Sequence, residues 1–238
     1  MHSETMARDM PGRVCAALVT VRGRMLLILG GEDRWRHDPG CVFIPLELPG
    51  GVCPEDASPA AAIAAIGQRW LGCPLRLLPA EITYGRSAQH AIDRLPLQAA
   101  PAPLLALERF IPADDPERGS GLQRLSVEVF CAARSVAASE TDRETGGSDD
   151  TAGIEPQEGC SGALLLSWQA LRQIVRGLPL ADLLARDDVT LRLRPGITLP
   201  PEGLVYLTGE YGERMLLRVA AKYGVRALGK DIDHGTGF

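Results

Sequence analysis

The N-terminal part of the chain contains two apolar runs separated by a short polar break. Residues 13–21 (RVCAALVTV) and 24–29 (RMLLIL) are rich in aliphatic and β-branched side chains, and only Arg22 and Gly23 lie between them. Two such runs joined by a two-residue turn that contains glycine are typical of a β-hairpin. We therefore expect the domain to open with two antiparallel strands.

A third apolar run lies at 42–48 and contains Pro45. Proline cannot donate a hydrogen bond to a neighbouring strand, so this run predicts an edge strand or a bulge. The stretch 30–40 before it is polar and rich in turn-forming residues, and we expect a loop there.

The segment 59–71 predicts a helix with clear start and stop signals. Ser58 is a good N-cap, because its hydroxyl can accept from an otherwise unpaired backbone N–H, and Pro59 suits the first helical position. Gly72 is a typical stop. Only two side chains in the segment are plainly polar, so we expect this helix to be buried on more than one side.

The rest of the chain alternates strand-like and helix-like segments. Strands with a long loop are expected within 75–112, and the run 104–111 is expected to pair with 122–134, which alternates well enough for a central strand. The pattern further predicts strands at 163–168, 189–193 and 203–207 and helices at 169–176, 180–186 and 210–223.

One acidic segment interrupts this pattern. Residues 137–160 hold seven acidic residues against one arginine, and Ile154 is their only large apolar residue. Such a segment buries too little apolar surface to offset the entropy of ordering it, so we expect it to be disordered.

Composition bears on the cellular location of the protein and on the partners it can have. The chain has no apolar run of 18 residues, and the polar segment 1–11 is unlike a signal peptide. We expect a cytoplasmic protein with no membrane partner. Its six cysteines show no Cys-x-x-Cys spacing, which disfavours zinc. The net charge of −5 and the lack of a basic stripe disfavour nucleic acid as a partner.

The stretch 51–73 resembles the Nudix box in its spacing. Gly51, Gly72 and the apolar Cys73 fall where that motif has its first glycine, its last glycine and its apolar end, and Leu-Pro-Gly precedes it. The resemblance implies an α/β fold, a Nudix-like α/β/α sandwich with a mixed β-sheet. It would span 13–186, including the acidic insert, with 187–238 as a C-terminal strand-strand-helix extension packed on it.

The chemistry of the box is absent, however. In Nudix hydrolases the box glutamates hold Mg²⁺ or Mn²⁺ against a diphosphate. Here those positions are Ala57, Ile66, Arg69 and Trp70. Positions 66, 69 and 70 share one helix face because they are spaced i, i+3 and i+4. We therefore expect no metal cofactor, and a face that is covered rather than open to water.

Three functions follow from the resemblance. The leading one is a pseudoenzyme, a Nudix-fold protein that has lost metal-dependent hydrolysis and serves as a nucleotide-diphosphate-type binding or regulatory module. Its ligand-binding candidates are Gly50, Gly51 and Arg69, since a guanidinium can supply the charge of a missing metal at a phosphate. Arg69 as a solvated charge, or as a partner for Asp56, remains the alternative interpretation. Homodimerisation is left open.

The second is a divergent hydrolase that cleaves a nucleoside diphosphate linked to another moiety. Its catalytic candidates are the acids Glu47, Glu55 and Asp56 around the glycines, and Mg²⁺ is expected only in this case. The third is a Nudix-related regulator that binds nucleic acid through a winged-helix tail. It is the least favoured, because the tail of this chain is short and its pattern predicts strand, strand, helix.

Overall fold

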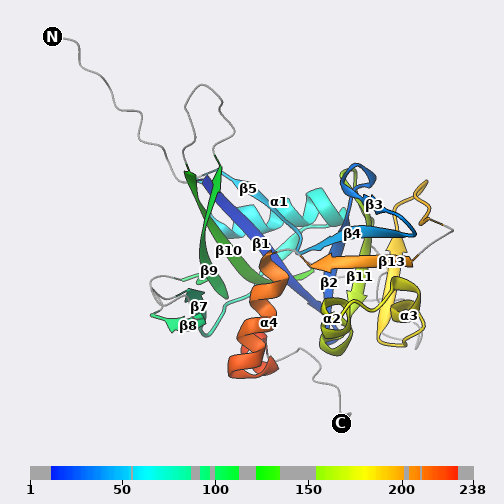
Figure 1. The fold of residues 1–238 in the computed structure, drawn as a ribbon. Coiled ribbons are helices and arrows are strands. Elements are labelled where there is room, and N and C mark those ends of the chain that lie inside the picture. Colours follow the sequence, from blue (N-terminus) through cyan, green and yellow to red (C-terminus); the bar gives the residue numbers. More distant parts are fainter. Residues whose placement is uncertain are drawn as a thin grey trace, which may run out of the picture.

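One mixed β-sheet with helices on both faces organises the chain in the computed structural model (Figure 1), which describes residues 12–54, 56–86, 92–96, 100–112, 122–134, 154–200, 204–209 and 211–229. The main path of the sheet, in spatial order, is β12 (Val189–Leu193), β11 (Cys160–Leu166), β2 (Arg24–Gly30), β1 (Gly12–Val21), β10 (Leu122–Arg134), β9 (Leu105–Pro112), β7 (Thr83–Arg86) and β8 (Ile92–Leu95). Joined to it are β3 (Arg36–Asp38), β4 (Cys41–Glu47), β5 (Gly50–Cys53), β6 (Leu75–Leu77) and β13 (Leu204–Gly209). The mixed α/β class is as predicted.

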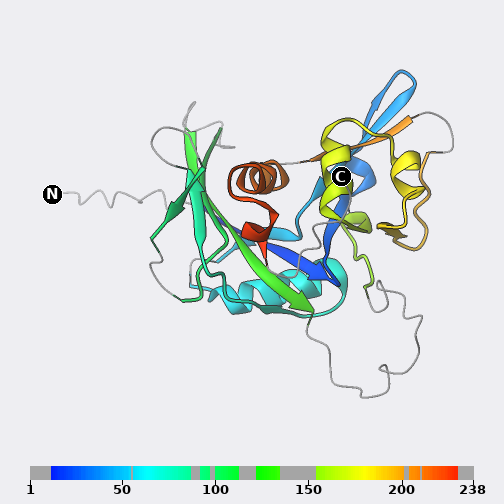
Figure 2. The ribbon, with the colours of Figure 1, turned by 90° about the horizontal axis from the view of Figure 1, so that it is seen from below.

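The helices form a layer on each face of the sheet (Figure 2). Helix α1 (Pro59–Leu71) packs on one face, and α2 (Trp168–Val175), α3 (Leu180–Leu184) and α4 (Tyr211–Tyr223) pack on the other. Short 3-10 helices are η1 (Glu32–Arg34) and η3 (Val225–Leu228). Strand β1 serves both cores, since Leu18 lies in the core with α4 and Ala17 in the core with α1. None of the helices in the described ranges has the length and apolar character to cross a bilayer.

The predicted N-terminal hairpin is confirmed. β1 and β2 pair antiparallel with Val21 opposite Arg24. The connecting residues Arg22 and Gly23 have φ values of 47° and 80°, the left-handed geometry of a tight hairpin turn. The predicted antiparallel pair β9 and β10 is also present, and the helices expected at 169–176, 180–186 and 210–223 correspond to α2, α3 and α4.

Strand β4 is paired on both sides, so the edge position expected for 42–48 is wrong. β13 runs parallel along β4 on one side, while β3 pairs with residues 41–43 and β2 with residues 46–47 on the other. Pro45 falls between these last two pairings. On that side of β4 the missing N–H of proline therefore interrupts no pairing, while on the other side Pro45 lies opposite Thr208 of β13. Because β12 and β13 both join the sheet, the C-terminal extension is part of its framework.

The disorder expected for 137–160 is wrong for its last seven residues. Ile154 is fully buried in the core beneath α1. The Glu155 N–H donates to the Leu71 carbonyl at 3.0 Å, and the Gln157 N–H donates to the Trp70 carbonyl at 3.3 Å. The segment is held because it supplies an apolar side chain and satisfies carbonyls that the end of a helix leaves unpaired. The remainder of the predicted insert, 137–153, lies outside the described residues.

Candidate functional site

Helix α1 forms where the sequence predicts it. The Ser58 hydroxyl accepts from the Ala61 N–H at 3.2 Å, and Gly72 ends the helix with a φ of 67°. Its buried residues lie on one side, however, so burial on more than one side is wrong. The exposed side is largely alanine, which favours helix without needing burial. Gly67 lets the helix approach β6, since a Cβ there would lie 2.5 Å from Leu75 Cγ.

The glycines before α1 belong to strand β5 and do not form a loop. Gly50 and Gly51 pair with Ala16 and Cys15 of β1. A Cβ on Gly50 would lie 3.0 Å from the Cys15 carbonyl oxygen, so the close approach of the two strands accounts for the glycine there.

Two of the three helix positions at which Nudix hydrolases have glutamates are occupied by packed apolar groups. Ile66 is only 5% exposed and belongs to the core beneath α1. The Trp70 indole Nε1 donates a 2.6 Å hydrogen bond to the Gly50 carbonyl. Its ring also lies against Gly159, where a Cβ would come within 3.5 Å of it. This part of the face joins α1 to β5 and to the 154–160 segment.

Arg69 is the exposed member of this face. Its guanidinium carbon lies 5.1 Å from the centre of the Trp70 ring, and its Nη1 would lie 3.6 Å from a Cβ on Gly51. No ion pair connects it to Asp56 within the described ranges. The structure thus brings Arg69 and Gly51 together, whereas the Gly50 carbonyl is used by Trp70.

Two of the three candidate catalytic acids lie in the described part of the chain, and they have different surroundings. Glu47 forms an ion pair with Arg34, Asp56 is exposed, and Glu55 lies outside the described residues. The carbonyl of Ala57, at the first box glutamate position, accepts from Arg13 Nη1 at 3.1 Å. In the part of the chain that is described, no three acidic, histidine or cysteine side chains are grouped as a metal site requires. Mg²⁺ prefers several oxygen ligands, so these residues do not fit it.

Glu213 is a buried carboxylate beside this site that the sequence reasoning did not single out. It lies in α4, is 1% exposed, and accepts a 2.5 Å hydrogen bond from the N–H of Leu48, 165 residues away in the chain. The sequence holds a signal for this, since Glu213 is spaced i, i+3, i+7 with the apolar residues Leu216 and Ala220, which places it on the apolar face of the helix. The carboxylate connects α4 to the chain just before Gly50.

Two of the cysteines, Cys15 and Cys131, have thiols that burial keeps protonated. Burial raises the pKa of the Cys15 thiol to about 12, with a contribution from neighbouring Cys53, and burial raises that of Cys131 to about 11. All six cysteines are free thiols. Thiols with raised pKa values are poor nucleophiles and poor metal ligands at neutral pH.

Comparison with known proteins finds similarity at the level of structure. No protein-family model and no curated protein matches the chain in sequence. Similar solved structures include a Nudix hydrolase from Nitrosomonas europaea (9% identity, TM-score 0.36, 67% of this chain and 58% of that chain). They also include a Nudix family hydrolase from Clostridium perfringens (11% identity, TM-score 0.37, 68% and 85%) and an ADP-ribose pyrophosphatase from Streptococcus suis (12% identity, TM-score 0.35, 90% and 93%).

The TM-scores of these three similarities all lie below 0.4, so they identify neither the family nor the activity of this chain. The match to the Nitrosomonas europaea protein spans less than two thirds of that protein.

Proposed function

We propose that this protein is a Nudix-fold binding or regulatory module that lacks metal-dependent hydrolysis. The observation that carries the proposal is the packing of Ile66 and Trp70. Ile66 is 5% exposed, and Trp70 is hydrogen-bonded to Gly50 at 2.6 Å. A metal bound to this face would need oxygen ligands at positions that here hold an aliphatic side chain and an indole.

The ligand that we propose is of the nucleoside diphosphate type, bound at Arg69 and the adjoining edge of β5. A guanidinium is planar and permanently charged, and it can bind a phosphate with two parallel hydrogen bonds. Arg69 is exposed beside Gly51. Within the described sheet β5 is paired only with β1, and Val52 is 77% exposed. The outer edge of β5 is thus open to a ligand near Val52, while at Gly50 its carbonyl is taken by Trp70.

The divergent hydrolase is the weaker candidate. Its acids would have to gather around a metal, yet Glu47 is paired with Arg34 and Asp56 points to solvent. The Arg34 guanidinium already neutralises the Glu47 carboxylate. This ion pair would have to break before Glu47 could bind a divalent cation.

A hydrolysis assay and a binding assay together test the proposal. With ADP-ribose and Mn²⁺ we expect no turnover, and calorimetry without metal should show binding that weakens about tenfold in Arg69→Gln, the loss of one charge-assisted contact. Arg76→Gln, a matched change at an exposed residue of β6, should leave binding unchanged. Metal-dependent turnover that disappears in Glu47→Gln or Asp56→Asn would instead establish the hydrolase.

A further inference from the structure

A second, independent feature lies on the opposite face of the sheet, between α2 and α4. Two hollows of about 480 Å³ and 530 Å³ lie there. The first is bordered by α2 and the C-terminal half of α4, and the second by α2, β13, β4 and the N-terminal half of α4. Val175 and Leu217 line both hollows, so the two form one groove. We call it the α2–α4 groove.

The groove carries four guanidinium groups and no carboxylate among its described lining residues. Arg172 and Arg176 come from α2, and Arg214 and Arg218 come from α4. All four are exposed. The only acid on either helix within the groove region is Glu213, which is 1% exposed and accepts from the Leu48 N–H. In a chain with a net charge of −5, this surface is locally positive.

The helix dipole explains the positions of only two of these four arginines. Arg172 lies in the last turn of α2 and Arg176 is its C-cap, where a cation is favoured by the helix dipole. Arg214 lies in the first turn of α4, where a cation is disfavoured. Its Nε donates to the Gly209 carbonyl at 3.1 Å, which holds the guanidinium at the mouth of the groove.

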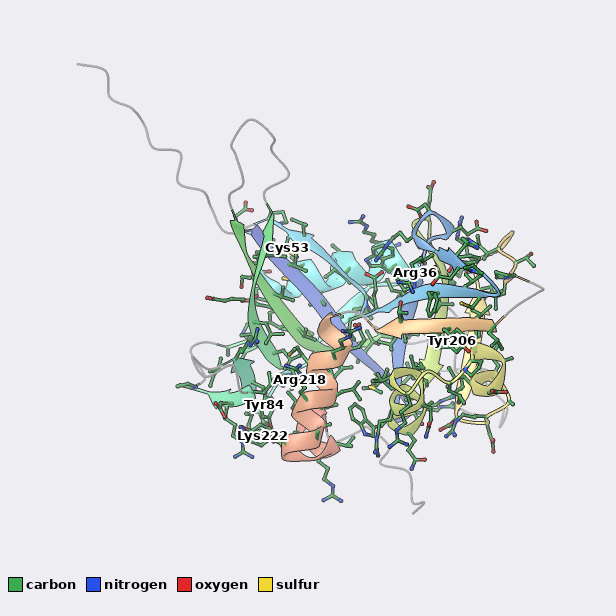
Figure 3. The ribbon with its side chains drawn as sticks, in the orientation of Figure 1. Arg36, Cys53, Tyr84, Tyr206, Arg218 and Lys222 are labelled. Atoms are coloured by element: carbon green, nitrogen blue, oxygen red, sulfur yellow. The ribbon has the colours of Figure 1, made fainter. Side chains whose placement is uncertain are left out.

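The floor of the groove is apolar. Val175, where the two hollows meet, is 55% exposed and so presents an apolar surface to the groove. At one end Tyr206 stacks against Phe43 with ring centres 5.6 Å apart. Figure 3 labels Arg218 on α4 and Tyr206 on β13, two elements that border this hollow. Apolar walls with a few converging charged groups, in a volume of several hundred Å³, are typical of small-molecule sites.

We propose that the α2–α4 groove binds an organic phosphate. The arginines would hold the phosphate groups, because their forked donors match phosphate oxygens. The apolar floor between Tyr206 and Val175 would hold the organic body. The site is separate from the one proposed at Arg69, which lies with α1 on the other face of the sheet.

Calorimetry with ADP tests the proposal on the full-length chain carrying Arg69→Gln, so that binding near α1 is weakened about tenfold and the groove is measured above it. We expect ADP to bind more tightly than adenosine or tripolyphosphate, because only ADP uses both the floor and the arginines. Arg172→Gln together with Arg218→Gln should weaken ADP binding at least tenfold. Arg76→Gln together with Arg86→Gln, an equal charge change at exposed residues of β6 and β7, should alter it less than twofold.

Val175→Asp provides a second variant, since it places a carboxylate at the junction of the two hollows and should also weaken ADP binding at least tenfold. No measurable ADP binding at 1 mM, or binding that is unchanged in both groove variants, would overturn the proposal. Tight binding of a 12-residue oligothymidylate without ADP binding would overturn it too, and would make the groove a nucleic-acid surface.

Discussion

The indole of Trp70 donates a 2.6 Å hydrogen bond to the carbonyl of Gly50, and this bond fastens the end of α1 to strand β5. Gly50 directly precedes the stretch 51–73 that resembles the Nudix box, and Trp70 lies near the end of that stretch. The Trp70 side chain thus makes a structural hydrogen bond from a position at which the Nudix box has a metal-binding glutamate.

Trp70→Phe tests the contribution of this bond. The ring area is largely kept, but the Gly50 carbonyl loses its partner, so we expect a loss of about 1 kcal/mol in the free energy of unfolding. Urea denaturation measures it. Gln68→Ala, an exposed change in the same helix, is the control and should stay within about 0.5 kcal/mol of the parent protein. Equal stabilities of Trp70→Phe and this control would show that the bond contributes nothing.

Two single replacements that introduce glutamate at positions where the Nudix box has it should have opposite outcomes. Ile66→Glu puts a carboxylate in the apolar core beneath α1 and should cost more than about 3 kcal/mol or prevent folding. Arg69→Glu changes an exposed residue and should cost less than about 1 kcal/mol. A stable, soluble Ile66→Glu protein would mean that this face opens to water.

Glu213 should matter through its hydrogen bond to Leu48. Glu213→Leu leaves the buried Leu48 N–H without its acceptor, and we expect a loss of about 2–3 kcal/mol in the free energy of unfolding. Glu213→Gln keeps a carbonyl oxygen in reach of that N–H and should lose less than half as much. If chemical denaturation ranks the two variants in the reverse order, the role assigned to the carboxylate is wrong.

Asp188 gives a pH dependence with a defined sign. Hydrogen bonds from Arg186, at 2.8 Å, hold the pKa of Asp188 below its usual value, and Ser167, the N-cap of α2, adds to the effect. A depressed folded-state pKa gives stability that is present above the unfolded value of about 3.9 and is lost as the pH falls through the folded value. The stability difference between the parent protein and Asp188→Asn should therefore be constant above about pH 5 and shrink below about pH 4. A difference that persists unchanged at pH 2 would contradict it.

Local signals made much of the fold predictable. The hairpin turn at Arg22 and Gly23 and the capped helix from Ser58 to Gly72 each depend on neighbouring residues, and both formed as predicted. What the sequence could not reveal depends on contacts between distant segments. The parallel pairing of β13 with β4 joins segments about 160 residues apart, and it places Pro45 inside the sheet.

The candidate site, too, was predictable only where it depends on neighbouring residues. The absence of box glutamates is visible in the sequence, but their replacement by packed groups involves partners from elsewhere in the chain. Ile154 lies in a segment whose composition favours disorder, yet its side chain completes the core beneath α1. Glu213 reaches Leu48 from the last helix. Composition averages over a window and cannot reveal a single buried anchor within it.

Calorimetric titration with Mn²⁺ decides whether the face of α1 that carries Ile66 and Trp70 can hold a metal ion. Because both side chains are packed against other parts of the chain, we expect no binding tighter than about 1 mM, the range of a weak carboxylate site, in either the parent protein or Asp56→Ala. Micromolar Mn²⁺ binding that is lost in Asp56→Ala would show instead that a metal site exists beside this face.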